Sequence, residues 1–182
     1  NPLDSSGYGN HGTEIGGPTY TSGNYGRAIQ LDGVDDYVAV GYEVGVSGLA
    51  PRTIAGWAKA DSSSITNWTN VFGLTGASVA GGHFDIQIVG ATNSTTEGWF
   101  GLHMYGDEYD ILPNDMEWHH FAASFDGTTA SVYGDAALIG SAAPENADAT
   151  PLTLNTFDNV QVGKRGDNAN YFPGIVDDVQ IW

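Results

Sequence analysis

The chain has 182 residues, and its 22 Asp and Glu against five Lys and Arg give a formal net charge of −17. A surface this negative repels phosphate backbones and anionic headgroups, which excludes direct nucleic-acid binding. The chain has no cysteine and no apolar run long enough to cross a membrane, so disulfides, thiolate metal sites and membrane insertion are excluded as well. The length predicts a single domain over residues 1–182.

Alternation of apolar and polar residues dominates the chain, and 26 glycines with seven prolines favour short strands joined by turns. The turn-rich segment 32–35 lies between two such strands and predicts a hairpin. The expected strands are 28–31, 36–40, 53–60, 70–75, 83–89, 98–105, 118–126, 130–141, 158–164 and 174–182. About ten short strands predict an all-β fold, a two-sheet antiparallel β-sandwich or jelly roll.

Two of these strands carry an apolar face and a polar or aromatic face. The predicted core positions are Phe84, Ile86, Ile88, Phe100, Leu102 and Met104. The opposite faces carry Asp85, Gln87, Trp99, His103 and Tyr105. Aromatic rings beside hydrogen-bonding groups suit a carbohydrate platform, and Trp68 and Tyr109 are candidates for the walls of the same cleft. The alternative is that these aromatic side chains pack under a loop.

The last strand places Asp177 on the same face as the apolar residues Ile175, Val179 and Ile181. An ionised carboxylate in such surroundings needs a partner, and with few cationic side chains in the chain a bound Ca²⁺ is one candidate. The alternative is that Asp177 caps backbone N–H groups.

Five segments in order carry a family resemblance: residues 4–13, 28–38, 53–59, 118–127 and 174–182. Together they resemble the laminin-G-like jelly-roll modules of the concanavalin A-like lectin/glucanase superfamily. The resemblance implies two antiparallel sheets packed face to face, with the N-terminal and C-terminal strands side by side.

The same resemblance implies a calcium ion near the place where the termini meet. The implied ligands are Asp4, Asn10 and Asp177, together with backbone carbonyls of the loop that ends at Gly12. Carboxylate, amide and carbonyl oxygens are the ligands that Ca²⁺ takes in proteins. A second cation site at Asp32, Asp35 and Asp36 is conceivable, but turn chemistry alone explains a hairpin of that composition.

The glucanases of the superfamily carry the pattern Glu-x-Asp-x-x-Glu, whose carboxylates face one cleft. The nearest segment here begins at Glu108 and Asp110 but ends at Pro113, so no catalytic activity is predicted. Residues 107–110 are expected to form a loop that faces solvent. The adjacent His119 and His120 must project to opposite faces and cannot chelate one ion, and no other histidine spacing is typical of a catalytic metal site.

The predicted function is therefore that of a non-catalytic, lectin-like carbohydrate-binding module with a structural Ca²⁺. We expect it to be extracellular and covalently linked to neighbouring domains of a secreted enzyme or adhesin. The negative charge favours neutral glycans over acidic ones. The alternative is a structural or adhesive spacer of a cell-surface protein that has no glycan ligand.

Overall fold

The structure, a computed structural model, describes residues 2–40, 49–65, 68–75, 82–90, 98–104, 108–143, 159–166 and 170–182. These ranges contain strands, turns and bends, and no helix that could cross a membrane lies in them.

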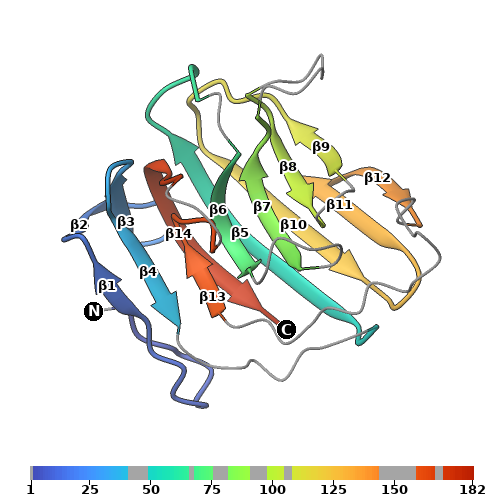
Figure 1. The fold of residues 1–182 in the computed structure, drawn as a ribbon, viewed down its shortest axis with the longest axis horizontal. Helices are drawn as coiled ribbons and strands as arrows, with labels where there is room; N and C mark the ends of the chain where they lie inside the picture. Colours follow the sequence, from blue (N-terminus) through green and yellow to red (C-terminus); the bar gives the residue numbers. More distant parts are fainter. Residues whose placement is uncertain are drawn as a thin grey trace.

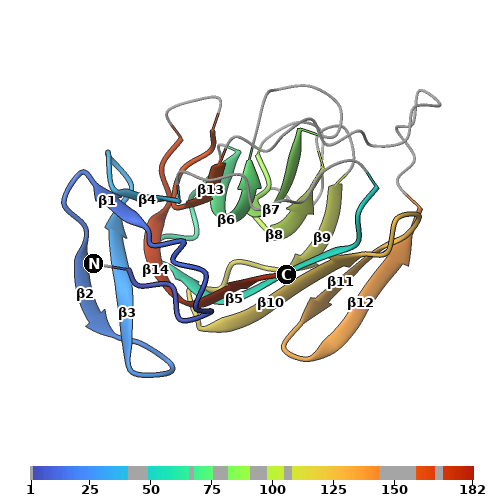
Figure 2. The ribbon, with the colours of Figure 1, turned by 90° about the horizontal axis from the view of Figure 1, so that it is seen from below.

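The described strands form two antiparallel sheets of seven strands each (Figure 1). Sheet A runs in the order β1 (Thr13–Ile15), β4 (Tyr37–Val40), β13 (Asn159–Val162), β6 (Thr69–Thr75), β7 (His83–Ile88), β8 (Phe100–His103) and β9 (Glu108–Leu112). Sheet B runs in the order β12 (Ala137–Ala142), β11 (Ala130–Gly134), β10 (His119–Phe125), β5 (Arg52–Ala60), β14 (Pro173–Ile181), β3 (Arg27–Asp32) and β2 (Thr19–Ser22). Figure 2 shows the two sheets as stacked layers, which confirms the predicted β-sandwich.

The core lies between the two sheets and consists of the inward-facing residues of both. All six apolar positions predicted on β7 and around β8 are buried in it. Phe100 of sheet A stacks on Phe121 of sheet B with ring centroids 4.5 Å apart, so the two layers are joined by direct aromatic contact. The inner faces of β7 and β8 are therefore the ones that the alternation of apolar and polar residues predicted.

The segments 28–31 and 36–40 do not form the predicted hairpin. β3 pairs with β2 and β14 in sheet B, whereas β4 pairs with β1 and β13 in sheet A. The turn between them carries the chain from one layer to the other, because Leu31 and Val38 both pack into the core between the sheets. The local Asp and Gly chemistry predicted the turn correctly, but it could not specify the partners of the flanking strands.

Three strands were not predicted, and one segment predicted as a single strand forms two strands. The short strands β1, β2 and β9 lie at or near sheet edges, where apolar alternation is weak. Glu108 and Asp110, which were expected in a loop at 107–110, instead belong to β9 (Glu108–Leu112), although both are exposed as predicted. The segment 130–141 is divided by a turn at Asp135 and Ala136, both of which have positive φ, into the paired strands β11 and β12.

The last strand contains a β-bulge that the alternation argument missed. Its pairing with β5 shifts register between Asp177 and Gln180, and Asp178 has a φ of 48°. The shift reverses the faces, so Val176 before the bulge and Val179 after it both pack on the core. Asp177 is thus on the outer face of sheet B and does not share a face with Val179.

The terminal strands are not adjacent, contrary to what the resemblance implied. β14 pairs with β3 and β5 in sheet B, whereas β1 pairs with β4 in sheet A. It is the third strand of the chain, rather than the first, that lies beside the last.

Phe100→Ala should lower the free energy of unfolding by about 3–5 kcal/mol, because it removes a fully buried ring that contacts both sheets and leaves a cavity. Chemical denaturation measures this change. Leu138→Ala is the control, since Leu138 is 59% exposed and its truncation should change stability by less than about 0.5 kcal/mol. Equal effects of the two substitutions would contradict the assignment of the core.

Candidate functional site

A row of polar residues crosses the outer face of sheet A, over the middle of the sandwich. Directly paired residues of neighbouring strands project to the same face. The row, from β13 to β9, is Gln161, Gly73, Asp85, His103 and Glu108. Gly73 contributes no side chain, so the row is interrupted between Gln161 and Asp85.

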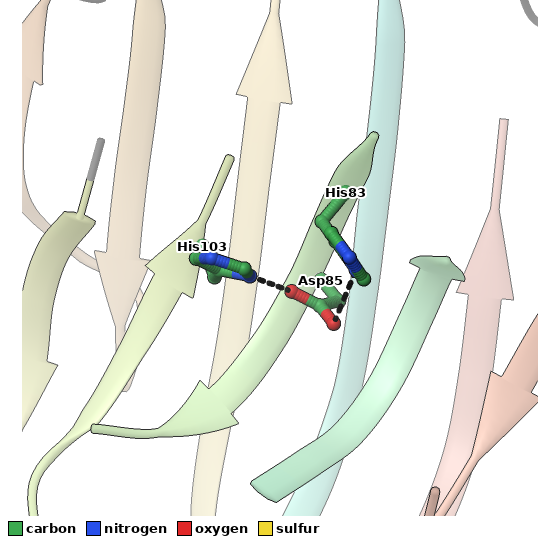
Figure 3. Close-up of side chains that lie close together, drawn as sticks. All are labelled: His83, Asp85 and His103. Carbon is green, nitrogen blue, oxygen red and sulfur yellow. Dashed lines mark ion pairs between the residues drawn. The ribbon is translucent and has the colours of Figure 1, made fainter. Parts of the chain in front are cut away.

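Three titratable side chains gather at the centre of this row (Figure 3). His83 and Asp85 are two residues apart on β7, and His103 lies opposite Asp85 on β8. The Asp85 carboxylate lies between the two imidazoles: Oδ1 is 3.3 Å from His103 Nδ1, and Oδ2 is 3.8 Å from His83 Nδ1. The ring centroids of His83 and His103 are 5.0 Å apart.

All three side chains are almost completely buried, which affects their protonation. Burial by itself raises the pKa of Asp85, but the interactions with His103 and His83 outweigh it and lower the pKa to about 2. Burial lowers the pKa of His103 below its ordinary value, against the opposing effect of Asp85. The cluster therefore contains a carboxylate that stays ionised at neutral pH beside an imidazole whose protonation is disfavoured by burial.

Three amide side chains lie next to this cluster on the same face. Asn70 of β6 is paired with Gln87 of β7, and Gln161 lies on β13. All three are buried, and both ends of the Gln87 amide lack a hydrogen-bond partner among the described residues, as do Asn70 Oδ1 and Gln161 Oε1. Asn70 Nδ2 is the exception, since it donates to the backbone carbonyl oxygens of Lys164 and Gln161 at 2.8 and 3.4 Å.

A tryptophan lies at the edge of the polar face. The Trp68 ring is partly exposed, with its centroid 6.2 Å from that of His103. It lies so close to Gly90 that a Cβ at this glycine would be 2.7 Å from the indole, so only glycine fits there. The Trp68 carbonyl accepts a hydrogen bond of 2.9 Å from the Asn170 amide, which fixes its backbone.

The predicted carbohydrate-binding residues are thus only partly brought together. Asp85, Gln87, His103 and Trp68 converge on one face, although the first three are buried rather than open to solvent. Trp99 is half-buried and directly precedes β8, where its carbonyl accepts the Val89 N–H. Tyr105 lies outside the described residues.

Tyr109 does not join this face. It pairs with Leu102, an inward-facing residue of β8, and packs against the core. The side chains of β9 that lie beside His103 and Gly101 on the outer face belong to Glu108 and Asp110.

Sequence reasoning missed His83, Asn70 and Gln161. The alternation that selected Asp85 and Gln87 also places His83 on the same face, so His83 could have been predicted from the sequence. Asn70 and Gln161 could not be predicted, because only strand pairing brings Asn70 beside Gln87 and places Gln161 in the same row as Asp85.

The residues predicted to bind calcium have separate sets of protein contacts. The Asp4 carboxylate accepts hydrogen bonds from the Ser6 hydroxyl and from the N–H groups of Ser6 and Asn10, which lower its pKa to about 2. The Gly12 N–H donates to the Pro2 carbonyl.

Asp177, the remaining predicted ligand, accepts the Tyr25 N–H at 2.8 Å. Backbone capping therefore accounts for the positions of both Asp4 and Asp177 in this structure. Asp32, Asp35 and Asp36 do gather within 4.8 Å of one another, but Asp32 likewise accepts N–H groups of its own turn.

Comparison with known proteins extends the picture of the fold. Residues 32–182 match the family described as the concanavalin A-like lectin/glucanases superfamily. A search of the curated proteins found no match.

Several solved structures share the architecture. One is domain 4 of AbnA, a GH43 extracellular arabinanase from Geobacillus stearothermophilus, in complex with arabinotriose: 20% identity, TM-score 0.70, and coverage of 100% of this chain and 86% of that chain. Another is a GH54 α-L-arabinofuranosidase, with 15% identity, TM-score 0.71 and coverage of 98% and 46%. A third is botulinum neurotoxin type C, whose cell entry is described as dependent on interaction with two ganglioside molecules, with 14% identity, TM-score 0.70 and coverage of 99% and 44%.

The chain spans most of the AbnA domain but less than half the length of the other two chains. At these identities, the structural similarities show a common fold. The family match is independent of them and covers most of the sequence. This chain therefore belongs to the concanavalin A-like lectin/glucanase superfamily.

Proposed function

We propose that this domain is a non-catalytic carbohydrate-binding module that binds a neutral glycan at the outer face of sheet A. The observation that carries the proposal is Gln87, a wholly buried amide whose donor and acceptor ends both lack a partner among the described residues. A buried polar group without a hydrogen bond is destabilising by about 1–3 kcal/mol. Asn70, which is paired with Gln87, adds an acceptor beside it, and Gln161 adds another on β13, two strands away. Sugar hydroxyls both donate and accept, so they match this set of amide groups.

The surroundings of these amides support a sugar over other small polar ligands. Trp68 offers a partly exposed aromatic ring at the edge of the polar face, and pyranose or furanose C–H groups pack on such rings. The net charge of −17 opposes the approach of acidic polysaccharides. Two of the structurally similar proteins are described with arabinotriose and with gangliosides, respectively, which favours glycan binding for this fold as well.

The non-catalytic assignment rests on the carboxylates of β9. Glu108 and Asp110 project to the outer face, but the residue where the glucanase pattern has its last Glu is Pro113, directly after the strand. The domain would then deliver a linked partner domain to a polysaccharide outside the cell, as domains of extracellular enzymes do. An assay for release of reducing ends from each oligosaccharide that binds should show no hydrolysis.

Gln87→Met should reduce the affinity for the best-binding neutral oligosaccharide by about tenfold or more while retaining or raising the melting temperature. Methionine has about the volume of glutamine but lacks the amide donor and acceptor. A bound sugar would use these two groups, whereas in the protein alone they are buried without a hydrogen bond. Isothermal titration calorimetry with arabino-, xylo- and gluco-oligosaccharides, alongside differential scanning calorimetry, measures both quantities.

Gln30→Met is the matched control on sheet B. Gln30 Nε2 donates to Asp61 at 2.7 Å and to the Gly174 carbonyl at 3.3 Å, so its replacement should lower stability and leave glycan affinity unchanged. If Gln87→Met binds glycan like the wild type, the amides serve the fold or hold water, and the proposed site is wrong.

Trp68→Ala should weaken the same complex by about tenfold, because a stacked aromatic ring contributes about 1–3 kcal/mol to such a contact. Trp57→Ala is the control: Trp57 packs on Tyr25 and His120 at the outer face of sheet B, far from sheet A in the layer order. A wild-type protein that is folded and binds no neutral glycan would instead support the spacer function.

Calcium binding through Asp4, Asn10 and Asp177 also remains a proposal. A ligand that binds only the folded state at 100 times its dissociation constant stabilises that state by about 2.7 kcal/mol. The melting temperature should therefore rise by several degrees when millimolar Ca²⁺ is added after chelation, and Asp177→Asn should abolish the rise. An unchanged melting temperature would mean that backbone N–H donors are the only partners of these carboxylates.

A further inference from the structure

We propose that His83, Asp85 and His103 bind one divalent transition-metal ion, with Zn²⁺ as the best match. The proposal stands on the arrangement of these three side chains on the outer face of sheet A (Figure 3). It does not depend on glycan binding.

The strand geometry supplies three ligands on a rigid support. His83 and Asp85 are two residues apart on β7, so they project to one face, and His103 is the direct cross-strand partner of Asp85 on β8. Pairing of β7 with β8 holds Asp85 opposite His103, and pairing of β7 with β6 holds His83 opposite Thr75. Sites on strands are held more precisely than sites on loops.

The distances between ligand atoms suit an ion better than direct hydrogen bonds. A charge-assisted N–H···O bond measures about 2.7–2.9 Å. The Nδ1–O distances here are 3.3 and 3.8 Å, and one ligand atom from each side chain lies within 4.8 Å of the other two. Ligands bound to Zn²⁺ at about 2.0–2.2 Å in a tetrahedron are separated by about 3.3–3.6 Å. His103 Nδ1 and Asp85 Oδ1 already have that separation, whereas the His83 imidazole, 3.8 Å from the other carboxylate oxygen, must move for its nitrogen to join the same shell.

The donor types select the class of metal. Two imidazole nitrogens and one carboxylate oxygen suit Zn²⁺ and neighbouring transition metals, whereas Ca²⁺ takes six to eight oxygen ligands. Three protein ligands leave one tetrahedral position for water or for an oxygen atom of a bound molecule. This site therefore differs in chemistry from the all-oxygen calcium site proposed at Asp4, Asn10 and Asp177.

The charges around the cluster set its expected affinity. Asp85 supplies one negative charge, and the cluster is buried, which strengthens its attraction for a cation. With one carboxylate and no thiolate among the ligands, we expect the site to bind Zn²⁺ more weakly than zinc sites built from several thiolates.

The test is titration of the chelator-treated full chain with Zn²⁺ by calorimetry and with Co²⁺ by visible absorption. The wild type should bind one equivalent of Zn²⁺ and give the intense d–d bands of low-coordinate Co²⁺. His83→Gln and His103→Gln should each lower the affinity by about a hundredfold, since each removes one of three ligands. His120→Gln, which alters a histidine packed on Trp57 in sheet B, should bind like the wild type.

A measurement on the wild type keeps the proposal testable if a buried-histidine variant does not fold. In long-range ¹H–¹⁵N spectra of the five histidines, Zn²⁺ should perturb the two imidazoles of His83 and His103, and excess Ca²⁺ should not reverse the change. Absence of Zn²⁺ binding by the folded wild type, or perturbation of other histidines only, would overturn the proposal. A protein that binds Zn²⁺ but no glycan would support this inference and contradict the proposed function.

Discussion

The packing of sheet A on sheet B through one apolar layer is the constraint on which the other features depend. Phe100 and Phe121 meet ring to ring at the centre of this layer, and the inner residues of β6, β7 and β8 surround them. Because side chains alternate along a strand, an apolar inner face leaves every second residue of these strands on the outer face. The packing of the core therefore determines which positions face outward, but it does not determine which residue types occupy them.

On the outer face of sheet A the available positions hold groups that are costly to bury. A carboxylate, two imidazoles and three amides occupy the central strands, and nearly all are removed from solvent. The amide ends that lack a hydrogen-bond partner among the described residues are a cost that a fold needing only stability would avoid. The concentration of buried polar groups on one face, with a tryptophan at its edge, is the physical basis for the proposal that this face binds a ligand.

The outer face of sheet B provides the contrast within the same molecule. Its polar residues have partners: Gln30 donates to Asp61, and Asp177 accepts from the backbone of Tyr25. The aromatic residues Trp57 and His120 pack on each other at 5.2 Å. Polar groups on this face thus serve the connections between strands and turns, and the Tyr25 N–H gives the Asp177 carboxylate a partner within the protein.

By itself, the sequence determined the all-β class, the inner faces of β7 and β8, and half of the polar face. Two-residue alternation is a local property, and in a strand it directly gives the face to which each side chain projects. It also showed that His119 and His120 project to opposite faces. Only the tertiary structure decided that β3 and β4 belong to different sheets and that a bulge at Asp178 exchanges the inner and outer faces of the last strand. Likewise, His103 lies 20 residues from His83 in the chain, and Asn70 lies 17 residues from Gln87. These groups meet because strands pair across the sheet, and pairing partners are selected by the burial of whole faces, which no local pattern specifies.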